Sequence, residues 1–103
     1  MKEQIGKLTV VWDKNVYAIF EKACKRIEQD SVINANNVRK EVLTITKSLS
    51  DNPEKFPADK YKIDNDGTYR AFEKYRFRIS YNITSNQIRI LRFRSTDQEA
   101  KNY

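Results

Sequence analysis

The 103-residue sequence contains no histidine, a single cysteine (Cys24), two glycines and two prolines. One cysteine cannot form a disulfide bond within the chain, and it cannot build a thiolate-rich zinc or iron–sulfur site. Without histidine, the chain lacks the usual side chain for acid–base catalysis near neutral pH and for metal binding. We therefore expect no metal and no cofactor. Cys24 lies on an apolar helical stripe, which favours a small buried side chain over a reactive thiol.

Long hydrophobic segments are also missing. Residues 1–13 contain no apolar core of signal-peptide length, and no later window approaches a membrane span. A chain of this length usually forms one domain, so we assign residues 1–103 to a single domain. These features predict a soluble cytoplasmic protein that does not contact a membrane.

Positive charge is concentrated in residues 69–94. This stretch holds seven basic residues and one acidic residue, Glu73, whereas the remainder of the chain has equal numbers of both. The stretch therefore accounts for the whole formal net charge of +6 at pH 7. A strongly basic sheet is typical of proteins that bind polyanions. A solvated basic surface without such a partner is the alternative.

Two amphipathic helices are predicted in the first half of the chain. A β-branched strand at residues 7–12 leads to Asp13, a good N-cap for a helix that ends at about residue 29. Asp30 or Ser31 caps the second helix. Apolar residues recur at helical spacing at Val16, Phe20, Ala23, Cys24, Ile27, Ala35, Val38, Val42, Ile45 and Leu49. We expect an antiparallel helix hairpin packed on another element; a dimer seam along the second helix is the alternative.

Three strands are predicted in the second half. The second helix stops at Asp51-Asn52-Pro53, and a loop follows, with a short extended piece at residues 60–63 and an NDG turn at residues 65–67. Strands at residues 69–73, 76–83 and 87–94 then form an antiparallel meander.

The last strand does not keep one hydrophobic phase. Ile88 and Ile90 share parity with Arg92 and Arg94, whereas Leu91 and Phe93 have the other parity. Either a β-bulge shifts the register or both faces of the strand are partly covered.

The arginines suggest contact with phosphate. If Arg76 and Arg78 share one face of a strand, they lie about 7 Å apart along it and can hold one phosphate or two consecutive phosphates. Tyr69, Tyr75 and Tyr103 can supply stacking surfaces for bases. RNA cleavage without histidine would depend on tyrosine, lysine, arginine or a carboxylate, whose pKa values match neutral pH poorly. We therefore expect any free nuclease activity to be weak.

The order of elements, together with YRAFEKYRFRISY, NQIRILRFRSTD and the closing KNY, resembles the RelE/ParE superfamily of type II toxin–antitoxin toxins. The resemblance implies a small α+β domain with an N-terminal strand, an antiparallel helix hairpin and a three-strand antiparallel meander. It also implies a neutralising antitoxin, acidic where it contacts the toxin, and allows a homodimer. In the RelE branch the toxin enters the ribosome and cuts bound mRNA, whereas in the ParE branch it inhibits DNA gyrase.

The resemblance also implies roles for single residues. Arg78 is similar to the arginine that stabilises the cleavage transition state, Arg94 to one that assists the leaving group, and Tyr103 to a late tyrosine that stacks on or activates the nucleotide. Arg70 lies near a basic position that contacts substrate phosphate or acts in proton transfer. Apart from the resemblance, we expect Arg76 and Arg92 to bind substrate phosphate together with Arg70. The chain departs from the ribonuclease pattern in having Phe72 and Ser95 where relatives carry lysine and histidine.

Three functional hypotheses follow. The first is a ribosome-dependent mRNA endoribonuclease that inhibits translation. The others are a DNA gyrase inhibitor and a non-toxic relative that binds nucleic acid. For the antitoxin, we expect an acidic segment over the arginine-rich sheet or along the helix hairpin, and a weaker complex when Arg76, Arg78 and Arg92 are neutralised together.

Overall fold

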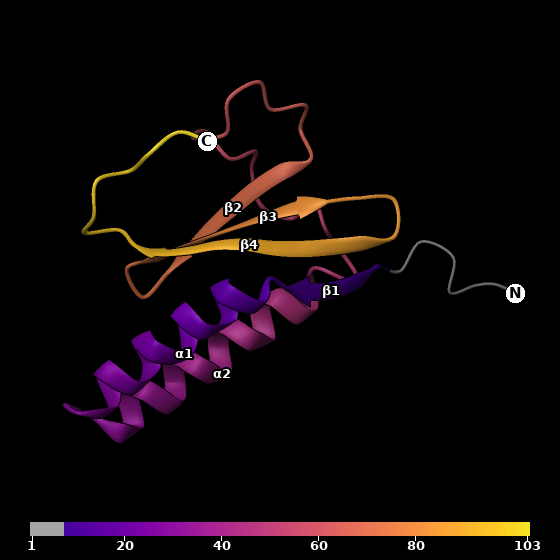
Figure 1. Ribbon diagram of the computed structural model, residues 1–103. Helices are drawn as coiled ribbons and strands as arrows, with labels where there is room; N and C mark the ends of the chain where they lie inside the picture. The colour runs from indigo at the N-terminus through magenta and orange to yellow at the C-terminus, as the bar shows by residue number, and fades with distance from the viewer. Residues whose placement is uncertain (1–7) are drawn as a thin grey trace, which may run out of the picture.

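The computed structural model describes residues 8–103, which form two layers: a pair of helices lies along one face of a β-sheet (Figure 1). Residues 1–7 are outside the described part. They include the first residue of the predicted first strand and about half of the stretch that argues against a signal peptide. Within residues 8–103, no helix is long and apolar enough to cross a membrane. The predicted α+β class is confirmed.

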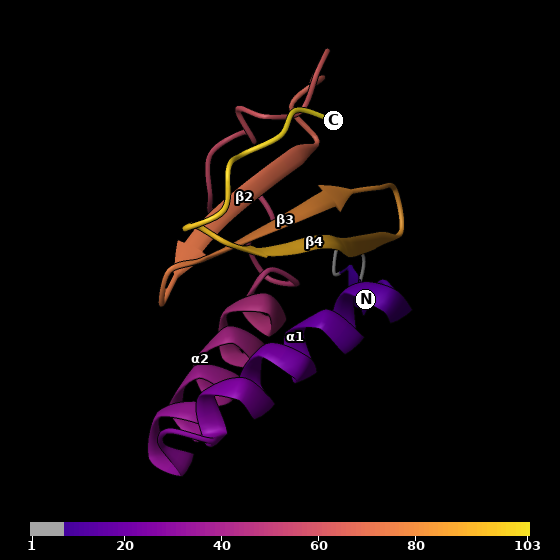
Figure 2. The ribbon, with the colours of Figure 1, turned by 60° about the vertical axis from the view of Figure 1, so that its left-hand side comes forward.

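The first half of the chain forms strand β1, Thr9–Trp12, and helices α1, Lys14–Glu28, and α2, Val32–Ser48. The two helices lie side by side as the predicted antiparallel hairpin (Figure 2). An ion pair of 3.2 Å between Glu21 on α1 and Arg39 on α2 joins their surfaces. The helix hairpin is therefore one unit that covers the sheet.

Short polar side chains begin both helices. Asp13 caps α1 as predicted, because its Oδ1 accepts the backbone N–H groups of Asn15 and Val16 at 2.9 and 3.1 Å. At the start of α2, the Oγ of Ser31 accepts the backbone N–H of Asn34 at 3.1 Å, which selects Ser31 from the two predicted caps. The joint between the helices is therefore only a few residues long.

The second half forms strands β2, Tyr69–Lys74, β3, Phe77–Ile83, and β4, Gln87–Ser95. They make the predicted antiparallel meander, and β1 joins it parallel to β4, which gives a mixed sheet of order β1-β4-β3-β2. The parallel pairing of β1 was not part of the prediction. It places the start of α1 at the end of the sheet where β1 finishes.

The loop before β2 differs from its prediction in one place. Residues 60–63 are turns, so the predicted extended piece there is wrong; the isolated bridge lies earlier, between Ala58 and Arg70. The predicted NDG turn is present. Asn65 Oδ1 accepts the backbone N–H of Gly67 at 2.8 Å, and Gly67 has a φ of 96°, which favours glycine.

A β-bulge in β4 explains the change of hydrophobic phase. Ser80 pairs with Arg92 and Tyr81 with Ile90, so Leu91 is an extra residue without a partner on β3. Because of it, Ile88 and Ile90 before the bulge and Phe93 after it are all buried. Of the two alternatives, the register shift is the one observed.

The core lies between the helix hairpin and the sheet. Phe20 on α1 is fully buried, and its ring lies 5.1 Å from the ring of Trp12 and 5.4 Å from that of Phe93. The α2 stripe also packs within the chain: Ile45 is partly buried against the core as predicted, and Thr46, which was not predicted, is buried as well. Cys24 is fully buried, and burial raises the pKa of its thiol, as suits a structural side chain.

Candidate functional site

The candidate site lies on the face of the sheet opposite the helix hairpin. In the sheet register Arg92 is paired with Ser80, and Arg94 with Arg78. Because side chains alternate along a strand, these residues point away from buried Ile79 and Tyr81. We call Arg78, Arg92 and Arg94 the arginine face. The loop before β2 and the segment after β4 lie on this side of the sheet (Figure 1).

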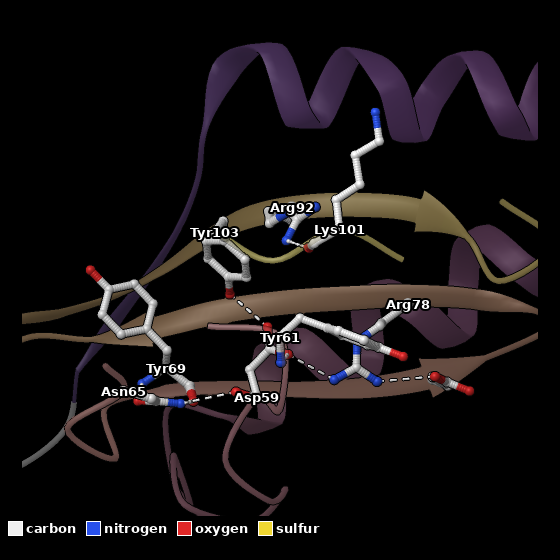
Figure 3. A network of polar contacts seen from close by, with 9 residues as sticks. Asp59, Tyr61, Asn65, Tyr69, Arg78, Arg92, Lys101 and Tyr103 are labelled. Atoms are coloured by element: carbon white, nitrogen blue, oxygen red, sulfur yellow. Dashed lines mark hydrogen bonds and ion pairs between the residues drawn. The ribbon is translucent and has the colours of Figure 1, made fainter. Parts of the chain in front are cut away.

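Asp59 is the centre of the polar contacts on this face (Figure 3). The residue is only 2% exposed. Its Oδ1 accepts hydrogen bonds from Arg78 Nη2 at 2.8 Å and from the backbone N–H of Tyr61 at 3.1 Å. Its Oδ2 accepts the hydroxyl of Tyr103 at 2.6 Å. One buried carboxylate thus joins a loop, strand β3 and the end of the C-terminal segment.

Arg78 has carboxylates on both terminal nitrogens. Besides its contact with Asp59, its Nη1 donates to Glu73 Oε2 at 3.0 Å, and the residue is 9% exposed. Its Nε is buried without a hydrogen-bond partner among the described residues. The guanidinium carbon lies 4.8 Å from the centre of the Tyr61 ring, so an aromatic surface covers it. Arg78 is therefore largely buried, and each of its terminal nitrogens donates to one carboxylate.

Tyr103 lies beneath two cationic side chains. The guanidinium carbon of Arg92 is 4.1 Å from the centre of its ring, and Lys62 Nζ is 5.6 Å from it. The Tyr69 ring meets the Tyr103 ring edge to face at a centroid distance of 6.2 Å. The stack of Arg92 on Tyr103 therefore forms one end of the site.

Backbone contacts hold the C-terminal segment in place. The Tyr103 N–H donates to the Tyr61 carbonyl at 2.9 Å, and the Ile63 N–H donates to the Tyr103 carbonyl at 2.6 Å. Arg92 Nη1 donates to the Lys101 carbonyl at 3.2 Å. The segment is thus fastened to both the loop and β4.

Arg94 lies at the other end of the site. Its guanidinium carbon is 5.4 Å from the centre of the Tyr61 ring, which therefore has Arg78 and Arg94 as neighbours. Arg94 Nη1 makes two long hydrogen bonds, of 3.4 Å to the Ser95 carbonyl and 3.5 Å to the Gln98 carbonyl. Arg94 is the member of the arginine face nearest to Arg78 along the sheet register.

The network changes the titration of two of its groups. Burial alone would raise the pKa of Asp59, but hydrogen bonds from Tyr103, Arg78 and the Tyr61 backbone outweigh burial and lower this pKa to about 2. Burial and the hydrogen bond to Asp59 raise the pKa of Tyr103 to about 12. At neutral pH, Asp59 is therefore ionised and Tyr103 is protonated.

The structure thus brings together Arg78, Arg92, Arg94 and Tyr103 of the predicted site residues. Arg70 lies elsewhere, because it pairs with Tyr81 and so projects to the helix side of the sheet. Its Nε donates to the Gly67 carbonyl at 3.1 Å and its Nη1 to the Phe56 carbonyl at 2.7 Å, contacts that hold the loop. Arg70 has a structural role here.

Arg76 and Tyr75 are also outside the arginine face. Both lie in the turn between β2 and β3 with positive φ, 67° for Arg76 and 53° for Tyr75, so Arg76 does not follow the alternation of β3. Arg76 forms an exposed ion pair with Asp97. The Tyr75 hydroxyl donates to Glu41 on α2.

Sequence reasoning missed Asp59, Tyr61 and the role of Glu73. Asp59 and Tyr61 lie in an irregular loop, where no periodicity marks a buried side chain. The available signal was Glu73, the single acidic residue in the basic stretch of residues 69–94. Its position on β2 opposite Arg78 becomes visible only with the sheet register.

Comparisons with known proteins agree with this architecture. Residues 10–100 match the family model described as "ParE toxin of type II toxin-antitoxin system, parDE". No curated protein sequence matches the chain significantly. The YoeB dimer structure from Staphylococcus aureus is similar, with a TM-score of 0.52, 17% identity, and coverage of 84% of this chain and 93% of that chain. At this identity the likeness concerns the fold alone.

Proposed function

This chain belongs to the ParE toxin family of type II toxin–antitoxin systems, and from this premise we propose that it acts by binding its cellular target rather than by cutting RNA. Its general role is that of a toxin, with a neutralising antitoxin as its partner. The proposed target is DNA gyrase, as the resemblance to the ParE branch implies. The proposed contact surface is the arginine face with the C-terminal segment that lies on it.

The observation that carries this proposal is the pairing of Arg78 with two carboxylates. A nuclease would need an arginine that offers N–H groups to the phosphate as negative charge develops on it. Here Nη2 of Arg78 is bound to buried Asp59 and Nη1 to Glu73. An internally neutralised arginine of this kind supports a binding surface better than a cleavage site.

The titratable groups support the same proposal. Efficient proton transfer near neutral pH requires groups whose pKa values lie close to it. The pKa of Asp59 is lowered to about 2 and that of Tyr103 is raised to about 12. Neither group is suited to take a proton from an RNA hydroxyl and return it to the leaving oxygen.

The test is to induce the chain alone in a bacterial host and to follow two readouts together. Mapping of mRNA 5′ ends on ribosomes would detect cleavage, and a supercoiling assay with purified gyrase and purified toxin would detect inhibition. We expect growth arrest and gyrase inhibition without new mRNA ends. Growth arrest with new ends in the ribosomal A site, and an unaffected gyrase, would contradict the proposal.

A ribosome-dependent mRNA endoribonuclease is the second candidate. What favours it is that Arg78, Arg94 and Tyr103 share one site, together with the Arg92 stack on Tyr103. The variant Arg78→Ala distinguishes this function, because cleavage that depends on Arg78 should vanish in it. Under the binding proposal, no cleavage exists for the variant to remove.

A further inference from the structure

We propose that Glu73 is a specificity-determining residue, which keeps the arginine face from binding the phosphates of single-stranded nucleic acid. This inference rests on the proposed function, because only a toxin whose target is not RNA gains from rejecting single-stranded nucleic acid. A protein with a net charge of +6 meets nucleic acid throughout the cell. A toxin whose target is not nucleic acid gains from a residue that weakens its binding to nucleic acid.

The two carboxylates on Arg78 differ in a way that supports separate roles. The Asp59 side chain is 0% exposed and is also held by Tyr103, so it stays on Nη2. The Glu73 side chain is 55% exposed, and it pairs with Arg78 Nη1 at 3.0 Å. Asp59 therefore positions Arg78, whereas Glu73 occupies Nη1 from an exposed position on β2.

The surroundings of Arg78 have the parts of a phosphate site. Glu73, Arg78 and Arg94 occupy one row across β2, β3 and β4. Arg78 and Arg94 lie near the same Tyr61 ring, at 4.8 and 5.4 Å from its centre. Paired guanidinium groups are the preferred protein ligands of phosphate, and exposed aromatic rings stack on bases.

Removal of the Glu73 charge would complete this site. With glutamine at position 73, Nη1 of Arg78 loses its anionic partner, and Arg78 and Arg94 can share a phosphate. One added charge-assisted hydrogen bond corresponds to an affinity gain of about tenfold. One added phosphate contact on a single strand should steepen the slope of log K against log salt by about 0.7.

The experiment compares the full chain, made by cell-free synthesis, with its variant Glu73→Gln. The probe is a short fluorescein-labelled single-stranded RNA of mixed sequence, titrated at several salt concentrations. We expect the dissociation constant to fall about tenfold at low salt, with the steeper slope. Circular dichroism verifies that both proteins are folded.

Glu41→Gln is the matched control. Glu41 is also a surface carboxylate in an ion pair, here with Lys74, and its side chain is 44% exposed, but it lies on α2. Both substitutions change the net charge equally. We expect less than about a twofold effect for Glu41→Gln, because screened charges act weakly over distance. Equal gains in the two variants would mean that only net charge matters and would overturn the proposal.

A double variant tests whether the gain passes through Arg78. Arg78→Lys keeps a cation beside Asp59 but removes the second donor group, so it should abolish the gain produced by Glu73→Gln. If the double variant unfolds, Glu73→Gln with Arg94→Gln provides the same test from the other side. Unchanged RNA binding in Glu73→Gln, or a gain for an acidic peptide with none for RNA, would contradict the assignment.

Discussion

The hydroxyl of Tyr103 donates a hydrogen bond of 2.6 Å to Asp59, although 44 residues separate the two in the sequence. This bond fastens the C-terminal segment to the loop before β2, and Arg78 donates to the same carboxylate. The arginine face therefore depends on Tyr103, a residue that carries no positive charge.

Asp59→Asn should destabilise the protein by about 3 kcal/mol, because it leaves buried Arg78 without its main counter-charge. The free energy of unfolding in urea measures the effect. Glu73→Gln is the comparison, since it removes the other ion pair of Arg78 at an exposed position, where the expected cost is below about 1 kcal/mol. Similar losses of unfolding free energy in the two variants would show that the burial of Asp59 does not increase its contribution to stability.

Stability should fall in acid because of Asp59. Its pKa in the folded protein is about 2, below the ordinary value of 3.8, so its ionised form stabilises the fold. This contribution is complete above about pH 4 and is lost as the pH falls toward 2. Unfolding measured across this range should show a steeper loss for the natural protein than for Asp59→Asn. Parallel pH profiles would contradict the assignment.

Spectrophotometric titration should find Tyr103 among the late phenols. Burial and the bond to Asp59 raise its pKa to about 12, so its contribution to stability is present below pH 10 and is lost as the pH rises toward 12. In Asp59→Asn the Tyr103 phenol should titrate earlier. Tyr81, whose pKa burial raises to about 12, donates to the Pro53 carbonyl and should not shift.

The complex with the antitoxin should weaken when Arg76, Arg78 and Arg92 are neutralised together. The three arginines should contribute unequally to this loss of affinity, because they differ in their partners within the chain. Arg76 is paired with Asp97, and Arg78 with two carboxylates, whereas no carboxylate partner of Arg92 is found in residues 8–103. Arg92→Gln alone should therefore produce most of the loss, measured by calorimetric titration with the antitoxin. Unchanged affinity in the triple variant would exclude an electrostatic contact here.

Local patterns in the sequence predicted most of the fold. Asp13 and the helical spacing predicted α1, and alternation predicted the meander. The change of hydrophobic phase in β4 was consistent with a bulge at Leu91 and also with partial burial of both faces. The sequence could not distinguish the two, because the bulge is defined by how β4 pairs with β3. The parallel partner of β1 could not be predicted, since no local feature marks which strand it joins.

The site was predicted less completely than the fold. Arg70 shares strand parity with buried Phe72, a pattern that could have indicated its position on the helix side of the sheet. Asp59 carries no comparable signal. It contacts Arg78 and Tyr103, which lie 19 and 44 residues further along the chain, and such contacts leave no periodic trace in the sequence.

The parallel pairing of β1 with β4 also determines the order in which the protein can be completed on the ribosome. Thr9 is aligned with Gln87, so the first strand is synthesised long before its neighbour exists. The helix hairpin and the β2–β3 hairpin can form from neighbouring segments, but the sheet closes only after β4 leaves the exit tunnel. The arginine face, two of whose three residues lie on β4, can therefore form only after β4 has been synthesised.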